Sequence, residues 1–407
     1  MTDAGNAKPV TADSRPPTAL KPIAWMRRNL FNSFFNTILT VVAFGLILVL
    51  GQAILEWVFV TADWRPVTDN PILYLVGQYP RDQLWRVGVS LLLVSFLAGM
   101  SWGEWRGIMR SFAVLLAAGF AVMAIIPIGG QLGSLPVRIF FLINIGVIFL
   151  GFLLGSRKFV TSRRVLAGWL LSLFIIPILL RGVGDGTILP IVETSLWGGL
   201  LVTLFLAAGG ILLSFPLGVL LAFGRRSPLP VIKVFSIGII EGVRGVPLVT
   251  ILFMSSIILA LFLPPDFRPD RLWRALAGMT LFSAAYTAEN VRGGLQAVPS
   301  GQIEAAKAVG LTNFQTTRLI VLPQALRAVI PAIVGQFISL FKDTTLAIIV
   351  AINELLNIGK SILQSDVEFL QLQFEVYIFI AVVFWVLSYL MSFASRRLET
   401  ALGVGER

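Results

Sequence analysis

The chain has 407 residues, of which 57% are hydrophobic and only 13% are charged, whereas an ordinary soluble domain carries about 25% charged residues. This composition excludes a soluble globular protein and predicts an all-α polytopic membrane protein. Cysteine and histidine are both absent, so we expect no disulfide, no metal site and no catalytic residue of the common hydrolytic kinds.

The formal net charge of +11 has two explanations, nucleic acid binding or orientation charge on cytoplasmic loops. The second is typical of membrane proteins, because their Lys and Arg residues gather on the cytoplasmic side. We therefore expect membrane lipid and no nucleic acid among the partners. Residues 1–24 are polar, rich in proline and without the apolar core of a signal peptide, so they are predicted to form a disordered cytoplasmic tail.

Ten segments are predicted to cross the membrane, for which about 20 mostly apolar residues are needed. Placing the N-terminus inside and alternating puts most Lys and Arg residues on the cytoplasmic side, which favours a topology with both termini in the cytoplasm. The predicted spans are 34–58, 87–101, 111–128, 137–155, 165–181, 196–223, 246–263, 275–293, 327–350 and 373–394.

The chain changes character near residue 190. Before this point the loops between predicted spans are short, whereas after it charged residues enter the apolar segments and the polar loops lengthen. We therefore divide the chain into an accessory transmembrane region (25–190), a working half (191–398) and a second cytoplasmic tail (399–407).

The stretch 231–263 is too long for one straight span and carries charged residues in its middle. We expect 231–243 to form an interfacial or re-entrant helix and a span to start near Pro247, because proline is tolerated in a first helical turn. Glu241 and Arg244 are three residues apart, which predicts that they pair on one helix face and brace a gate or hinge.

A short loop of mixed polarity, 297–323, separates two predicted spans. Ser300 is expected to cap a first short helix, which Gly310 ends by adopting positive φ. Thr312 and Gln315 have the spacing of a capping box, which predicts a second short helix that ends or kinks at Pro323.

The first of these short helices offers a surface for close approach. Ile303, Ala306 and Val309 recur at helical spacing, and Ala305 beside Ala306 leaves the helix nearly smooth. The residues alone leave two interpretations open, a helix that docks into a groove on a partner protein or an amphipathic loop that lies on the bilayer.

Seven residues of this loop stand at fixed spacing, E-A-A-x3-G-x9-I-x-L-P. This pattern resembles the EAA signature of bacterial ABC importer permeases, without departure. The resemblance implies the transmembrane domain of a type I ABC importer, with about five core spans preceded here by about five accessory spans. It also implies that the loop couples the permease to an ATP-hydrolysing subunit through Glu304, Ala305, Ala306, Gly310, Ile320, Leu322 and Pro323.

The resemblance extends over the working half. The segments "EGVRGVPL" at 241–248, "SAAYTAENVRGGLQAVPSGQ" at 283–302 and "FKDTTL" at 341–346 are similar to blocks of the polar amino acid permeases of the HisM/HisQ-like subfamily. "ETSLWGGLLVTLFLA" at 193–207 and the long accessory region are similar to the general L-amino acid permeases of the Aap/Bzt type. This implies uptake of L-amino acids, with opines, glutamine or cystine as alternative cargoes.

The resemblance further implies an assembly in the bacterial inner membrane. Its other parts are an ABC ATPase dimer, a homologous permease subunit that we expect to be a different chain, and a periplasmic amino acid-binding protein. No Walker sequence occurs, so ATP and Mg are expected in the ATPase and no cofactor in this chain. A secondary, ion-coupled transporter and a membrane-embedded enzyme are the alternative classes.

Ionisable residues within predicted spans are functional-site hypotheses by default. Glu289 either meets the ammonium group of an amino acid or pairs with Arg292. Lys342 and Asp343 point about 100° apart on a helix, so each either contacts substrate or forms an ion pair with a neighbouring span, and we favour the ion pair. Thr344 is a further candidate for the path, although it can also bond back to its own helix.

Overall fold

The structure, a computed structural model, describes residues 22–125, 134–157, 160–184, 186–401 and 403. These residues form helices and two isolated β-bridges, and none of them lies in a strand. The chain divides into two units, Met1–Asp63 and Trp64–Arg407. The predicted N-terminal tail lies almost wholly outside the described residues, as does most of residues 402–407.

The first unit consists of α1 (Pro22–Asn29), α2 (Phe34–Glu56) and a π-helical turn, Trp57–Thr61. Ser33 caps α2, because its hydroxyl oxygen accepts a hydrogen bond from the Asn36 N–H over 3.2 Å. The segment Phe34–Thr61 is apolar on all sides, and none of it is buried inside the unit. A helix of this kind is long and apolar enough to cross a membrane, which agrees with the predicted span 34–58.

The second unit begins with the helices of the accessory region. α5 and α7 pack closely because glycines meet at their contact: a Cβ on Gly99 would collide with the Ile148 carbonyl, and one on Gly151 with the Phe96 carbonyl. The accessory helices are α3 (Arg65–Thr68), α4 (Pro71–Val76), α5 (Leu84–Trp105), α6 (Gly107–Ile125), α7 (Leu135–Gly155) and α8 (Ser162–Arg181).

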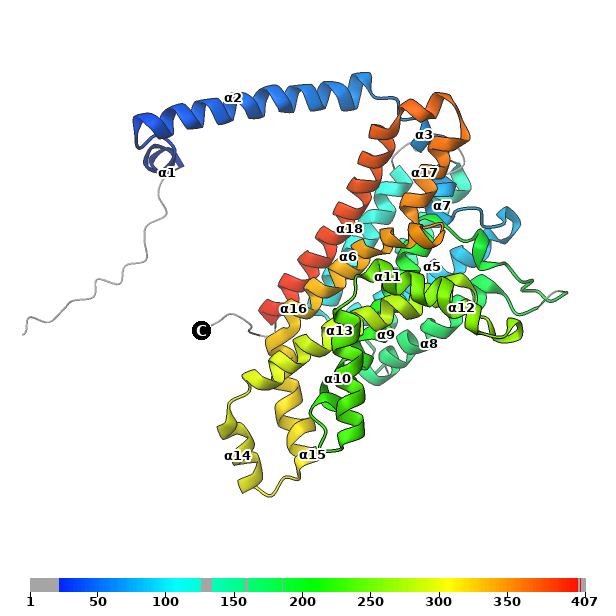
Figure 1. The fold of residues 1–407 in the computed structure, drawn as a ribbon. Helices are drawn as coiled ribbons and strands as arrows, with labels where there is room; N and C mark the ends of the chain where they lie inside the picture. Colours follow the sequence, from blue (N-terminus) through cyan, green and yellow to red (C-terminus); the bar gives the residue numbers. More distant parts are fainter. Residues whose placement is uncertain (1–21, 126–133, 158–159, 185, 402, 404–407) are drawn as a thin grey trace, which may run out of the picture. The chain divides into compact units, whose positions relative to one another are not determined.

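The working half is built around α13, which packs most extensively against α9 and also against α16 (Figure 1). Leu206, Met279 and Leu340 from these three helices are fully buried together. The helices of this half are α9 (Gly199–Arg225), α10 (Pro230–Arg244), α11 (Leu248–Phe253), α12 (Leu259–Phe262), α13 (Arg271–Ala297), α14 (Ser300–Ala308), α15 (Asn313–Thr316), α16 (Leu322–Asp343), α17 (Leu355–Ser365) and α18 (Gln373–Ala401).

Residues near the start of α5 join the accessory helices to the chain that leads into α9. Arg86 donates a hydrogen bond to the Pro190 carbonyl over 2.8 Å, and the Tyr79 hydroxyl donates to the Leu180 carbonyl over 2.7 Å. The Gly198 N–H bonds to the Val76 carbonyl beside it. The two halves therefore share a bonded junction at residue 190, and the predicted boundary there remains a prediction.

Seven helices among the described residues are long and apolar enough to cross a membrane, where ten spans were predicted. An eighth span is possible from α10 together with Leu248–Phe262, which are bent by 111° at residues 245–247. This bend agrees with the predicted break before Pro247. The predicted span 111–128 corresponds to the shorter apolar helix Met109–Ile125. The predicted span 275–293 lies in α13, whose 27 residues include too many polar ones for it to count among the long apolar helices.

Candidate functional site

The first helix of the EAA loop (297–323), α14, begins one residue earlier than the predicted cap at Ser300 implies. Pro299 occupies the N-cap position of α14 with φ −59° and ψ 138°, and the Ser300 side chain makes no capping bond. The prediction of a Ser300 cap is therefore wrong, because the proline ring already holds the extended conformation that precedes a first helical turn.

The end of α14 agrees with the prediction for Gly310, which has φ +83°. The Gly310 N–H bonds to the Lys307 carbonyl over 2.9 Å, and the Leu311 N–H bonds to the Ala306 carbonyl over 3.1 Å. These two bonds make a Schellman motif, which requires the left-handed conformation that glycine adopts without a steric cost.

The second part of the EAA loop also starts as predicted. Thr312 and Gln315 form both bonds of the capping box, with the Thr312 N–H donating to Gln315 over 2.9 Å. The predicted end of a separate short helix at Pro323 is not observed, since α15 continues through a π-helical turn, Thr317–Val321, into α16. Pro323 lies in the first turn of α16, where a missing N–H is tolerated, and the wider turn precedes it.

The exposed surface of the EAA loop differs from the predicted apolar stripe. Ala306 is only 5% exposed and faces its own chain, whereas Val309 is 77% exposed. Phe314 and Leu319 are also exposed, at 71% and 58%. Glu304 and Ala305 lie on the solvent-facing side of α14, and Figure 1 shows α14 and α15 extending away from the body of the working half.

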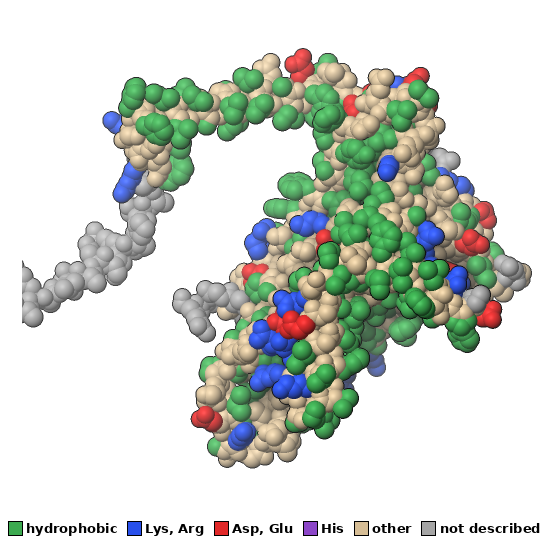
Figure 2. Space-filling model, in the orientation of Figure 1, with side chains coloured by type: hydrophobic (Ala, Val, Ile, Leu, Met, Phe, Trp, Pro, Cys, Tyr) green, Lys and Arg blue, Asp and Glu red, His purple; other side chains and the backbone are tan. Residues whose placement is uncertain are grey.

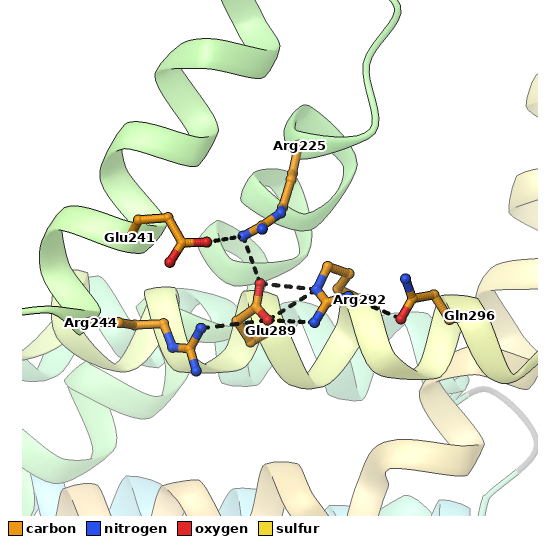
Figure 3. Close-up of polar contacts among 6 residues, drawn as sticks. All are labelled: Arg225, Glu241, Arg244, Glu289, Arg292 and Gln296. Atoms are coloured by element: carbon orange, nitrogen blue, oxygen red, sulfur yellow. Dashed lines mark hydrogen bonds and ion pairs between the residues drawn. The ribbon is translucent and has the colours of Figure 1, made fainter.

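A cluster of charged residues joins α9, α10 and α13, and we call it the Glu289 cluster (Figure 3). Its members are Arg225, Glu241, Arg244, Glu289 and Arg292. The Glu289 carboxylate is 14% exposed and meets three guanidinium groups: Arg225 donates over 2.9 Å, Arg292 donates over 2.8 Å, and Arg244 lies at 3.5 Å. One half-buried acid on α13 thus joins this helix to the ends of α9 and α10.

The partners of Glu241 and Arg244 are not the predicted ones. Arg225 donates to Glu241 over 2.7 Å, while Arg244 turns toward Glu289 and lies over the Tyr286 ring at 5.4 Å. The predicted Glu241–Arg244 pair is therefore wrong, because each of the two residues lies closer to an oppositely charged residue on a neighbouring helix. The Glu289–Arg292 pair is confirmed, and contact of Glu289 with substrate stays a prediction.

The sequence patterns did not single out Arg225. Arg225 is the last residue of α9 and bonds to both acids of the cluster. Its position directly after a long apolar span was the available signal. Figure 2 shows basic and acidic side chains gathered at the end of the molecule where α10 and α14 lie, below a mostly hydrophobic surface.

The residues Lys342 and Asp343 end α16, and the chain continues as a 3-10 helix, Thr344–Val350. Among the residues that the structure describes, neither is within ion-pair distance of an opposite charge on a neighbouring helix, so the favoured ion-pair lock is not observed. Lys342 is exposed and Asp343 is half-buried. The Thr344 hydroxyl donates to the Phe341 carbonyl over 2.7 Å, which is the predicted bond back to its own helix.

Glu354 is a second acidic residue that the sequence did not single out. It is fully buried, and its carboxylate caps α17 by accepting the Leu356 and Asn357 N–H groups over 2.8 and 2.7 Å. Burial raises the pKa of Glu354 to about 7, against the lowering effect of these two bonds. The residue lies between α16 and α17, outside the candidate spans.

Comparison with known proteins places this geometry in a family. Residues 214–404 match the model of the binding-protein-dependent transport system inner membrane component. The chain is 35% identical to the inner membrane amino-acid ABC transporter permease protein YhdY of Escherichia coli K12, over 96% of this chain and 97% of that one. It is also 35% identical to the glutamate/glutamine/aspartate/asparagine transport system permease protein BztC of Rhodobacter capsulatus, over 95% of each chain.

A solved structure described as an amino acid ABC transporter with histidines is 28% identical and covers 49% of this chain and 90% of its own, with a TM-score of 0.45. The two full-length relatives carry the assignment, since they match the accessory region as well as the working half. The predicted fold class is thereby confirmed, and the chain belongs to the family of binding-protein-dependent transport system inner membrane components, the permease subunits of ABC transporters.

Proposed function

We propose that this chain is a permease subunit of an ATP-driven importer that moves L-amino acids from the periplasm to the cytoplasm by alternating access. Its full-length relatives are described as amino-acid transport permeases, which supports this cargo class. The assembly we propose contains an ABC ATPase dimer that holds ATP and Mg, a homologous permease subunit and a periplasmic amino acid-binding protein. It lies in the bacterial inner membrane with both termini of this chain in the cytoplasm.

The EAA loop is the proposed contact with the ATPase, and its exposed apolar side chains are the observation that carries this. Val309, Phe314 and Leu319 are more than half exposed at a site that two glutamines, three threonines and Lys307 make unsuitable for lipid. Exposed apolar groups with polar surroundings mark protein contact sites. The Schellman motif and the capping box hold these side chains on a preformed surface, which lowers the entropic cost of docking.

The Glu289 cluster is the proposed brace of the cytoplasmic gate. It joins the ends of α9 and α10 to α13, which leads into α14. A movement of the EAA loop therefore reaches the cluster through one continuous helix and a two-residue linker. Glu289, Lys342, Asp343 and Thr344 remain proposed substrate-path residues, because they are polar groups in or beside the helices of the working half.

The test is uptake of labelled amino acids by proteoliposomes that contain the whole complex, with ATP inside. Glu304→Ala and Gly310→Ala should each abolish uptake and ATPase stimulation, while the binding protein still captures its ligand. Gly301→Ala is the matched control, because Gly301 has ordinary φ and open space around its Cα. Full uptake by both variants would remove the loop from the coupling pathway.

The same vesicles separate the proposal from an ion-coupled transporter. The proposed mechanism predicts that uptake requires internal ATP and is unchanged when ion gradients are abolished. Uptake without ATP that collapses with the gradient would instead establish a secondary transporter. Competition by unlabelled amino acids, opines and cystine would then define the cargo.

A further inference from the structure

A cavity of about 700 Å³ lies between the accessory helices and the last helix of the working half. It is lined by the ends of α5, α6, α7 and α18, and we call it the cationic pocket. Three arginines line it, Arg106, Arg110 and Arg397, and the lining contains no acidic residue. It is separate from the Glu289 cluster, with which it shares no residue.

The three arginines lack a carboxylate partner among the residues that the structure describes. The two acids nearest to them in the sequence are bonded elsewhere: Glu104 accepts from the Ser162 hydroxyl and Glu399 from the Ser395 hydroxyl, each over 2.7 Å. Three like charges around one cavity repel one another, so an anion in the cavity would stabilise them.

The position of the pocket indicates which kind of anion it would bind. The candidate spans Arg81–Trp105 and Leu135–Gly155 both end at the pocket, so it lies at the surface of the bilayer, on the face that the positive-inside rule predicts as cytoplasmic. Trp102 and Phe152 form part of its wall, with ring centroids 4.5 Å apart. A tryptophan at the level of the lipid headgroups is typical of this depth.

The pocket therefore combines guanidinium groups, the Ser111 hydroxyl and an aromatic wall. Arginine binds phosphate through two parallel hydrogen bonds, and the Ser111 hydroxyl can donate to a remaining oxygen, whereas the Ser156 hydroxyl donates to the Leu153 carbonyl over 2.9 Å. The aromatic wall suits the glycerol and the first acyl carbons next to the phosphate. A soluble phosphate compound would use the arginines but not this wall.

We propose that the cationic pocket binds the phosphate headgroup of an anionic phospholipid and thereby fastens α18 to the accessory helices α5, α6 and α7. Arg397 comes from α18, whereas Arg106 and Arg110 come from the start of α6 and the turn before it. The lipid phosphate bridges these two groups of cations, so the junction between the accessory region and the working half depends on the lipid composition.

The test is native mass spectrometry of the full chain, purified in detergent and titrated with dioleoyl phosphatidylglycerol. Replacing Arg106, Arg110 and Arg397 together by Gln should weaken phosphatidylglycerol binding about 100-fold, because each basic side chain near an anionic headgroup contributes roughly a factor of five. The control replaces Arg163, Arg226 and Lys233 by Gln, which removes the same charge from exposed positions outside the pocket and should leave binding unchanged.

Dioleoyl phosphatidylcholine should bind at least tenfold more weakly than phosphatidylglycerol to the unmodified chain. The proposal is overturned if the pocket variant and the control lose phosphatidylglycerol equally, since ordinary surface charge would then explain binding. It is also overturned if inorganic phosphate or glycerol phosphate displaces phosphatidylglycerol at equal concentration, because the pocket would then serve a soluble phosphate compound.

Discussion

Replacing Glu289 by Gln should destabilise the working half more than any other single change in its charged cluster. The substitution keeps the shape of the side chain and removes the charge that three arginines share. Ion pairs at exposed positions contribute at most about 1 kcal/mol, whereas removing one partner of a fully buried pair costs about 3–5 kcal/mol. Glu289 is 14% exposed and its arginines are 25–34% exposed, so we expect an intermediate loss of about 2 kcal/mol.

The loss is measured by titrating the purified chain from mild detergent into sodium dodecyl sulfate and following its unfolding by circular dichroism. A change of about 2 kcal/mol corresponds to roughly a 30-fold smaller folding constant. Glu241→Gln is the matched control: its side chain is 54% exposed and bonds only to Arg225, so the loss should stay below about 0.5 kcal/mol. Equal losses in the two variants would refute the view that Glu289 organises the cluster.

The remaining predictions concern other parts of the fold. Gly151→Ala should separate α5 from α7 and cost about 2 kcal/mol or more in the same titration, whereas Gly146→Ala on the same helix, with open space around it, should cost nothing. Gly310→Ala should strain the Schellman motif by about 1 kcal/mol and abolish the stimulation of ATPase activity, while Gly301→Ala should be tolerated. The pKa of Glu354 is about 7 in the folded chain against 4.5 when exposed, so the folded state holds the proton more tightly. Its contribution to stability should therefore be complete below pH 4.5 and fall by about 3 kcal/mol as the pH rises through 7, and Glu354→Gln should abolish this dependence. A stability profile of Glu354→Gln that still falls between pH 5 and 8 would assign the effect to another group.

Local patterns predicted local structure well, and contacts between distant residues could not be predicted in the same way. The capping box of Thr312 and Gln315 and the turn at Gly310 involve neighbours within a few residues, so their sequence spacing determines their geometry. Arg225 and Glu289 are 64 residues apart, and only the packing of α9 on α13 brings them together. A pair such as Glu241 and Arg244 satisfies the helical spacing rule, yet each finds a closer partner on another helix.

The polar character of α13 also explains part of the difference between the ten predicted spans and the seven long apolar helices among the described residues. Its 27 residues bury Ser283, Thr287 and many alanines against neighbouring helices, so its environment is protein rather than lipid over much of its length. A helix shielded in this way can carry Glu289 and Arg292 without exposing their charges to hydrocarbon. The same shielding fixes the register between α13 and α9, because their small residues allow close approach.

Glu289 lies eight residues before the end of α13, a rise of about 12 Å, and α14 of the EAA loop begins after a two-residue linker. In the proposed gating movement, a displacement of the loop therefore reaches the pairing of Glu289 with Arg225 and Arg244 through about two turns of one helix.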